Sequence, residues 1–140
     1  MITRPDTAQL PDGIRIPIVK RILHIGPEPI DESALVIQRT ASAGIGAALY
    51  FSGMVRGMEN SAAIAGIDYE AFLAMATHQF QKLFDELERR WPSIESIRLL
   101  HRTGPVRVGE SSLWIEILSP HRGESFAAGQ WLIDEMKRRS

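Results

Sequence analysis

The chain has 140 residues, of which 44% are apolar and 24% charged, so we expect one globular domain with its own core. Sixteen Lys and Arg residues against seventeen Asp and Glu residues give a net charge of −1, which favours neither nucleic acid nor an anionic membrane as a partner. The absence of cysteine excludes disulfides, thiolate metal sites and a cysteine nucleophile, so any sulfur chemistry must use sulfur from a partner. Without a signal-type N-terminus or a long apolar run, the predicted location is the cytoplasm.

The N-terminal segment differs from the rest of the chain. Prolines at positions 5, 11 and 17 and the pair Asp12-Gly13 interrupt residues 1–18, which show little periodicity. We therefore predict an N-terminal arm over residues 1–18 and a single domain over residues 19–140.

Capping residues and apolar runs predict the elements of the first half. Asp31 or Ser33 can cap a helix, because their side-chain oxygens accept hydrogen bonds from first-turn amides, and Gly44 and Gly46 would end it. The apolar run that follows contains β-branched and aromatic residues, as is typical of a buried strand. The predicted elements are a strand over 19–25, a helix over about 32–42, a strand over 45–55, a loop over 58–63 and a strand over 64–70.

The second half opens with a change to helical period. Apolar residues at three- and four-residue steps, from Ala76 to Trp91, predict a long helix that Pro92 terminates. Two strands follow, over 97–102 and 111–118, with Gly104 and Gly109 marking a tight connection between them. The last element is an amphipathic helix whose apolar face would hold Phe126, Gly129, Leu132, Ile133 and Met136. The order β-α-β-β-α-β-β-α predicts an α+β fold rather than a doubly wound parallel sheet.

Several motifs favour ordinary structural roles. Gly44-Ile45-Gly46 precedes a strand instead of following one, which disfavours a dinucleotide site. The four histidines (His24, His78, His101 and His121) lack metal-ligand spacing, so neither a metal nor a cofactor is expected. The charge run over residues 85–90 is interpreted as the solvated face of the long helix.

Three places allow a functional interpretation beside a structural one. Arg56 follows a strand between Gly53 and Gly57 and is either a phosphate ligand or a solvated turn residue. His121-Arg122 precedes a helix and is either an anion site or a polar helix entry. Lys137 lies close to the apolar side of the last helix, where it is either a partly desolvated base or nucleophile or a surface lysine.

Together these places resemble the large, catalytic subunit of molybdopterin synthase. Residues 46–57 (GAALYFSGMVRG) are similar to that family's glycine-bounded strand and arginine, and Tyr69-Glu70-Ala71-Phe72 to the start of its long helix. His101-Arg102 and Val108-Gly109-Glu110 resemble its next hairpin. Ser119-Pro120-His121-Arg122 and the stretch from Ile133 to Lys137 resemble its histidine-arginine loop and lysine helix, so the resemblance covers about residues 20–139.

The resemblance implies an α/β-hammerhead fold with an added small antiparallel β subdomain. It implies a homodimer flanked by two small ubiquitin-like sulfur carriers, which give thiocarboxylate sulfur to cyclic pyranopterin monophosphate to build the dithiolene of molybdopterin. Met54, Val55 and Arg56 would line the substrate pocket, His121 and Arg122 of the neighbouring subunit would hold the phosphate, and Lys137 would be catalytic. These roles fit the chemistry, because cationic donors bind a phosphate and a lysine can transfer a proton or capture an acyl group.

The resemblance departs at the end of the chain. The family continues with a proline, an aromatic pair and a second lysine, and nothing here follows Ser140. A deliberately shortened chain, a natural truncation and a relative with reduced activity all fit this ending, and we expect binding of substrate and carrier with poor turnover. Two hypotheses result, namely a sulfurtransferase subunit for molybdenum cofactor biosynthesis and a non-catalytic dimeric module that binds a ubiquitin-like carrier or a phosphorylated pterin. An unrelated phosphate-binding α+β domain is a third.

Overall fold

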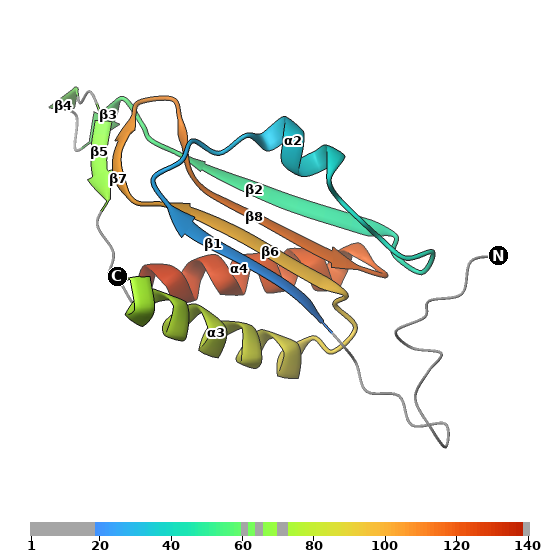
Figure 1. Cartoon of the computed structure of the whole chain (residues 1–140). Coiled ribbons are helices and arrows are strands. Elements are labelled where there is room, and N and C mark those ends of the chain that lie inside the picture. Colours follow the sequence, from blue (N-terminus) through green and yellow to red (C-terminus); the bar gives the residue numbers. More distant parts are fainter. Residues whose placement is uncertain (1–18, 60–61, 64–65, 70–72, 139–140) are drawn as a thin grey trace, which may run out of the picture.

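The computed structural model describes residues 19–59, 62–63, 66–69 and 73–138, so the predicted arm over residues 1–18 lies outside the described residues. The main feature is a four-stranded sheet with the strand order β1-β6-β8-β2 (Figure 1). β1 pairs with β6 in parallel, and β8 pairs antiparallel with both β6 and β2. The strands are β1 (Lys20–Gly26), β2 (Ala47–Met54), β6 (Ser96–Arg102) and β8 (Ser111–Ser119). Their predicted positions are confirmed to within about two residues.

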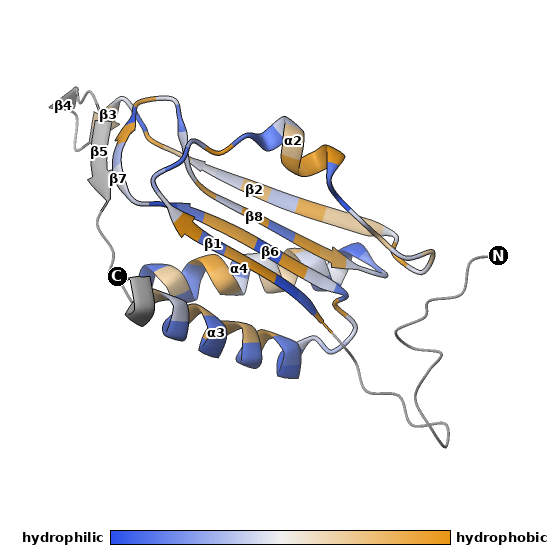
Figure 2. Ribbon diagram, viewed as in Figure 1, coloured by the Kyte–Doolittle hydropathy of each residue, from blue (hydrophilic) through white to orange (hydrophobic). Residues whose placement is uncertain are grey.

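Two long helices cover one face of this sheet, α3 (Leu73–Arg90) and α4 (Arg122–Arg138), as Figure 1 shows. The predicted stripe of α3 is confirmed, since Leu83, Phe84 and Leu87 are buried in the core, and the helix ends just before Trp91-Pro92. Figure 2 shows the outward side of α3 as mainly hydrophilic, as expected for a helix that buries one side. The core between helices and sheet comprises Leu83, Phe84, Leu87, Ile94, Ile97, Leu99, Ile115, Ile117, Ala128 and Leu132.

Among the described residues, the opposite face carries only the short helix α2 (Glu32–Ile37). The Asp31 cap is confirmed, because its Oδ1 accepts a 3.1 Å hydrogen bond from the Ala34 amide. The predicted extension to about residue 42 is wrong. Beyond Ile37, tertiary bonds draw the chain toward the sheet: Arg39 binds Glu116, and the Ser42 amide donates to Glu95 Oε2 over 2.9 Å.

Two small antiparallel ladders extend from one end of the sheet (Figure 1). They pair β3 (Met58–Glu59) with β4 (Ala62–Ala63) and β5 (Gly66–Tyr69) with β7 (Gly104–Arg107). The prediction of a loop over 58–63 is therefore wrong, since β3 and β4 lie there. The predicted tight connection after β6 likewise contains a strand, β7. Strands of two to four residues are too short to show a periodicity in the sequence. Gly104 and Gly109 adopt φ angles of 74° and 86°, the left-handed conformation that the predicted tight connection requires.

The apolar face of α4 differs from its prediction. Phe126 is 60% exposed, whereas Ser125, Ala128, Gly129 and Leu132 are buried. The small residues allow close packing, because a Cβ at Gly129 would lie only 3.0 Å from Leu49 Cδ2 of β2. The mixed sheet with helices and added antiparallel ladders confirms the predicted α+β class. Within the described ranges, no helix combines the length and apolarity needed to cross a bilayer.

Candidate functional site

The predicted substrate residues Met54, Val55 and Arg56 lie where β2 ends. Met54 is the last residue of the strand and is 59% exposed, whereas Val55 is buried and Arg56 is exposed. Val55 is held on both backbone atoms: its amide donates to Glu110 O over 3.1 Å, and its carbonyl accepts from Gly109 N over 2.9 Å. The turn between β7 and β8 therefore fixes the backbone from which Arg56 projects.

The Glu110 side chain stabilises this turn. Its Oε1 accepts hydrogen bonds from the Arg107 amide over 3.1 Å and from Arg102 Nη1 over 3.3 Å. The Arg107 amide, followed by the Arg102 guanidinium, holds the pKa of the Glu110 carboxyl below its ordinary value. Sequence reasoning noted Glu110 only as part of a resemblance and missed its contact with the site segment.

His121 and Arg122 lie at the opposite end of β2. Arg122 is the first residue of α4, and both residues are exposed. Gly46 packs against this loop so closely that a Cβ there would lie 2.5 Å from Pro120 O, which explains this glycine by packing rather than by a nucleotide. Because a strand rises roughly 3.3 Å per residue, the two ends of β2 are about 23 Å apart. One copy of the chain therefore does not bring His121-Arg122 together with Met54–Arg56.

Lys137 lies in the last turn of α4, beside a groove between that helix and β2. The groove has a volume of about 350 Å³, and its apolar walls include Leu49, Phe51, Phe126 and Ile133. Lys137 is exposed, as the surface-lysine alternative expects, but it lines this groove together with Asp134. The arrangement offers a lysine side chain beside a groove with largely apolar walls along the outer edge of the sheet, where β2 is the last strand.

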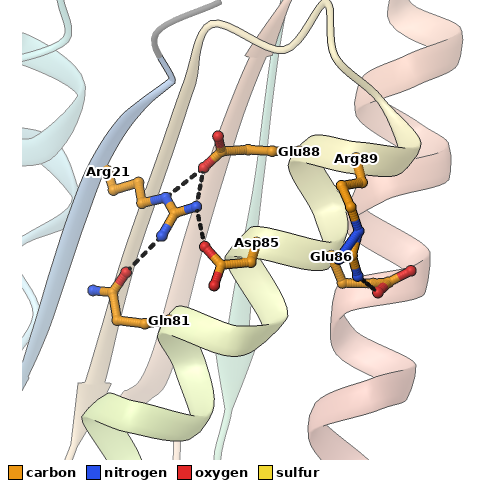
Figure 3. A network of polar contacts seen from close by, with 6 residues as sticks. All are labelled: Arg21, Gln81, Asp85, Glu86, Glu88 and Arg89. Carbon is orange, nitrogen blue, oxygen red and sulfur yellow. Dashed lines mark hydrogen bonds and ion pairs between the residues drawn. The ribbon is translucent and has the colours of Figure 1, made fainter.

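A second polar network joins β1 to α3 (Figure 3). Arg21 donates to Gln81 Oε1 over 2.9 Å, to Asp85 Oδ1 over 2.7 Å and to Glu88. Burial alone would lower the pKa of Arg21, but the hydrogen bonds to Asp85 and Glu88 outweigh it and raise this pKa. The interpretation of residues 85–90 as a solvated face is confirmed for Asp85, Arg89 and Arg90, which are exposed, and the structure adds that Asp85 and Glu88 bind Arg21. Arg21 lies two residues before Leu23 and therefore on the same, inward-facing side of β1, where a charge needs partners, so the sequence did contain a signal.

A third network lies on the face covered by α2, and we call it the Glu116 cluster (Arg39, Arg98 and Glu116). Glu116 is fully buried and accepts from Arg39 Nε over 2.5 Å and from Arg98 Nε over 2.7 Å. Arg98 also donates to Leu35 O over 2.7 Å, which fastens α2 to the sheet. None of the three lines the groove beside Lys137, and we interpret the cluster as an attachment of α2 to the sheet. No grouping of three or more His, Asp or Glu side chains that could hold a metal occurs in the described part of the chain.

The sequence and the fold are both similar to proteins of one family. The sequence model of the family described as MoaE protein matches residues 25–139. A molybdopterin synthase catalytic subunit from Nostoc sp. is 34% identical over 92 residues, which are 66% of this chain and 56% of that protein. The corresponding protein of Drosophila erecta is 36% identical over 112 residues, which are 80% of this chain and 30% of that protein. The alignments thus span about three tenths to a little over half of these curated relatives.

Solved structures give the same result for the fold. Molybdopterin synthase from Staphylococcus aureus superimposes with a TM-score of 0.74 at 28% identity, covering 81% of this chain and 82% of that one. A complex of subunits 1 and 2 of the molybdopterin-converting factor from Helicobacter pylori contains a chain with the same fold, with a TM-score of 0.69 at 21% identity and coverage of 82% and 77%.

Proposed function

The chain belongs to the MoaE protein family, and on that premise we propose that it is the catalytic, large subunit of a molybdopterin synthase. In this role it is a sulfurtransferase of molybdenum cofactor biosynthesis. It takes sulfur from the C-terminal thiocarboxylate of a small ubiquitin-like carrier and transfers it to cyclic pyranopterin monophosphate. The relatives named as catalytic subunits and the two-subunit complex from Helicobacter pylori support this proposal.

The observation that carries the proposal is the groove beside Lys137. A groove between α4 and an edge strand can take an extended carrier tail, and Lys137 lies beside it. Protonated, Lys137 can donate a proton to the leaving group, and deprotonated, its amine can capture the acyl group of the carrier. The absence of cysteine fits this chemistry, since the sulfur arrives on the partner.

Replacing the lysine tests its role directly. With thiocarboxylated carrier and cyclic pyranopterin monophosphate, we expect Lys137→Ala to lower the rate of dithiolene formation by about 10²–10⁴-fold, the range for losing a positioned proton-transfer group. Lys82→Ala is the matched control, because Lys82 is an exposed lysine on the neighbouring helix α3. Equal rates for the Lys137 variant and the wild type would remove Lys137 from the mechanism.

The separation of the two ends of β2 supports a homodimer in which His121 and Arg122 complete the partner's site. Two variants that should each be nearly inactive at low substrate concentration, Lys137→Ala and His121→Ala, should then restore each other when they are refolded together. About a quarter of the wild-type rate is expected, because half of randomly assorted dimers are mixed and each of these holds one intact site. No recovery in the mixture, with mixed dimers present by mass spectrometry, would contradict the shared site.

The same assay distinguishes the hypothesis of an enzyme from that of a non-catalytic binding module. Binding of carrier or substrate without any product would favour the module, and binding of neither would contradict the proposed function. The location of the protein in the cytoplasm stays a prediction, which cell fractionation would test.

A further inference from the structure

Two buried serines lie directly behind the loop that carries His121. Ser119 is the last residue of β8 and Ser125 lies in the first turns of α4, and neither is more than 1% exposed. Ser119 Oγ lies 2.6 Å from the His121 carbonyl oxygen, and the two hydroxyls are hydrogen-bonded to each other. We call them the serine pair. Because unpaired polar groups are costly in a core, these bonds constrain the loop.

The number of hydroxyl protons determines the direction of the hydrogen bonds in the serine pair. A carbonyl can only accept, so the single hydroxyl proton of Ser119 is donated to His121 O. The bond between the hydroxyls must then use the proton of Ser125. The Ile117 carbonyl, 3.4 Å from Ser125 Oγ, is a weaker second acceptor for that proton. The chain of bonds therefore runs from Ser125 through Ser119 to His121.

We infer that Ser119 and Ser125 are positioning residues for the anion site formed by His121 and Arg122. This inference rests on the proposed function. By fixing the His121 carbonyl, the serine pair fixes the peptide plane that joins His121 to Arg122, and so the directions in which the imidazole and guanidinium leave the backbone. Neither serine contacts substrate, since both are buried beneath the loop.

Other contacts hold the residues on either side of His121 and Arg122. Gly46 packs against the Pro120 carbonyl, and Ser93 Oγ donates to Glu124 in the first turn of α4. These contacts keep the loop folded when the serine pair is altered. The expected effect of removing a serine hydroxyl is therefore a change in alignment rather than loss of the loop.

The expected kinetics distinguish positioning from general stability. Within one chain, Arg122 and Lys137 are about 22 Å apart along α4, at a rise of roughly 1.5 Å per residue, so a misaligned His121 loop leaves that chain's Lys137 in place. Misalignment of the His121 loop should weaken binding of the phosphorylated substrate and leave the chemistry at Lys137 nearly unchanged. The signature is a raised KM with little change in kcat.

The experiment compares Ser119→Ala, Ser125→Ala and the double variant in the dithiolene assay. Ser119→Ala should raise KM for cyclic pyranopterin monophosphate by about 10–100-fold, Ser125→Ala should raise it less, and the double variant should match Ser119→Ala, because Ser125 acts through Ser119. Ser119→Thr keeps the hydroxyl and should restore KM. Ser96→Ala is the control, since Ser96 is a buried serine on the adjacent strand β6. If the chain binds substrate without turnover, the dissociation constant replaces KM.

Each remaining outcome overturns a defined part of the inference. Unchanged KM in Ser119→Ala, with a raised KM in His121→Ala, would refute positioning and leave the proposed function intact. Unchanged KM in both variants would refute the anion site itself. If kcat falls as much as KM rises, and Ser96→Ala gives the same result, the serine pair has only a structural role. Additive effects in the double variant would refute the direction from Ser125 to Ser119.

Discussion

The two faces of the four-stranded sheet are held by different forces. The face toward α3 and α4 buries a continuous apolar core that includes Phe84, Ile97 and Leu132. The face toward α2 buries the Glu116 cluster, in which Arg98 also binds the α2 backbone. Aromatic rings complete that face, with Arg98 located 5.0 Å from the centre of the Trp114 ring and Arg39 located 5.4 Å from that of Tyr50.

The difference shows how one sheet holds two long helices on one face and the short helix α2 on the other. Apolar burial is proportional to area and tolerates small shifts, so it can support two long helices. A six-residue helix such as α2 buries too little area for that, and directional charge-assisted bonds fasten it instead. Figure 2 agrees with this comparison, since the second half of α2, where Ile37 is 83% exposed, is hydrophobic yet uncovered.

The largest expected effect on stability comes from a cavity in the apolar core. Phe84→Ala should lower the free energy of unfolding by about 3–5 kcal/mol, because it removes a fully buried ring and leaves a cavity. Urea denaturation would measure the change. Ile37→Ala on the other face is the control and should cost under about 0.5 kcal/mol. Similar losses for the two variants would contradict the assignment of the core to the helical face.

A smaller effect should follow from breaking the Glu116 cluster. Glu116→Gln keeps the shape but leaves two guanidinium groups without a counter-charge, so we expect a loss of about 2–3 kcal/mol in the free energy of unfolding. Replacing all three charged residues by apolar ones of similar size should cost less than the single change, since buried ion pairs are replaceable as a unit. If the triple variant is less stable than Glu116→Gln, the three charges contribute more to the free energy of unfolding than the attachment of α2 alone explains.

The smallest effect is a dependence on pH. The folded pKa of Glu110 is below its ordinary value of 4.5, so the unfolded chain binds more protons in that range. The contribution of Glu110 to stability is therefore present above about pH 4.5 and is lost as the pH falls through the folded pKa. Denaturation curves at descending pH should show a shallower acid loss for Glu110→Gln than for the wild type. Identical slopes would mean that the Arg102 and Arg107 contacts do not persist in solution.

Local sequence signals predicted most of the elements correctly. The period of α3 together with Pro92, the Asp31 cap, and the two turn glycines Gly104 and Gly109 all act within a few residues of chain, so they are visible without a fold. The candidate residues Met54–Arg56, His121-Arg122 and Lys137 were also found, through residue type and ordered motifs. Their roles are proposals, and the sequence alone could not show that the first two groups lie at opposite ends of one strand.

The sequence by itself determined the α+β class, the positions of the long helices and strands, and the family to which the motifs belong. The tertiary structure decided where α2 ends, which strands pair, and which charges are buried. Glu116 and Asp85 look alike as acidic residues in amphipathic elements, yet one is fully buried between arginines and the other binds Arg21 at the surface. Such pairings join residues far apart in the chain, and only packing the elements together brings their charges within bonding distance.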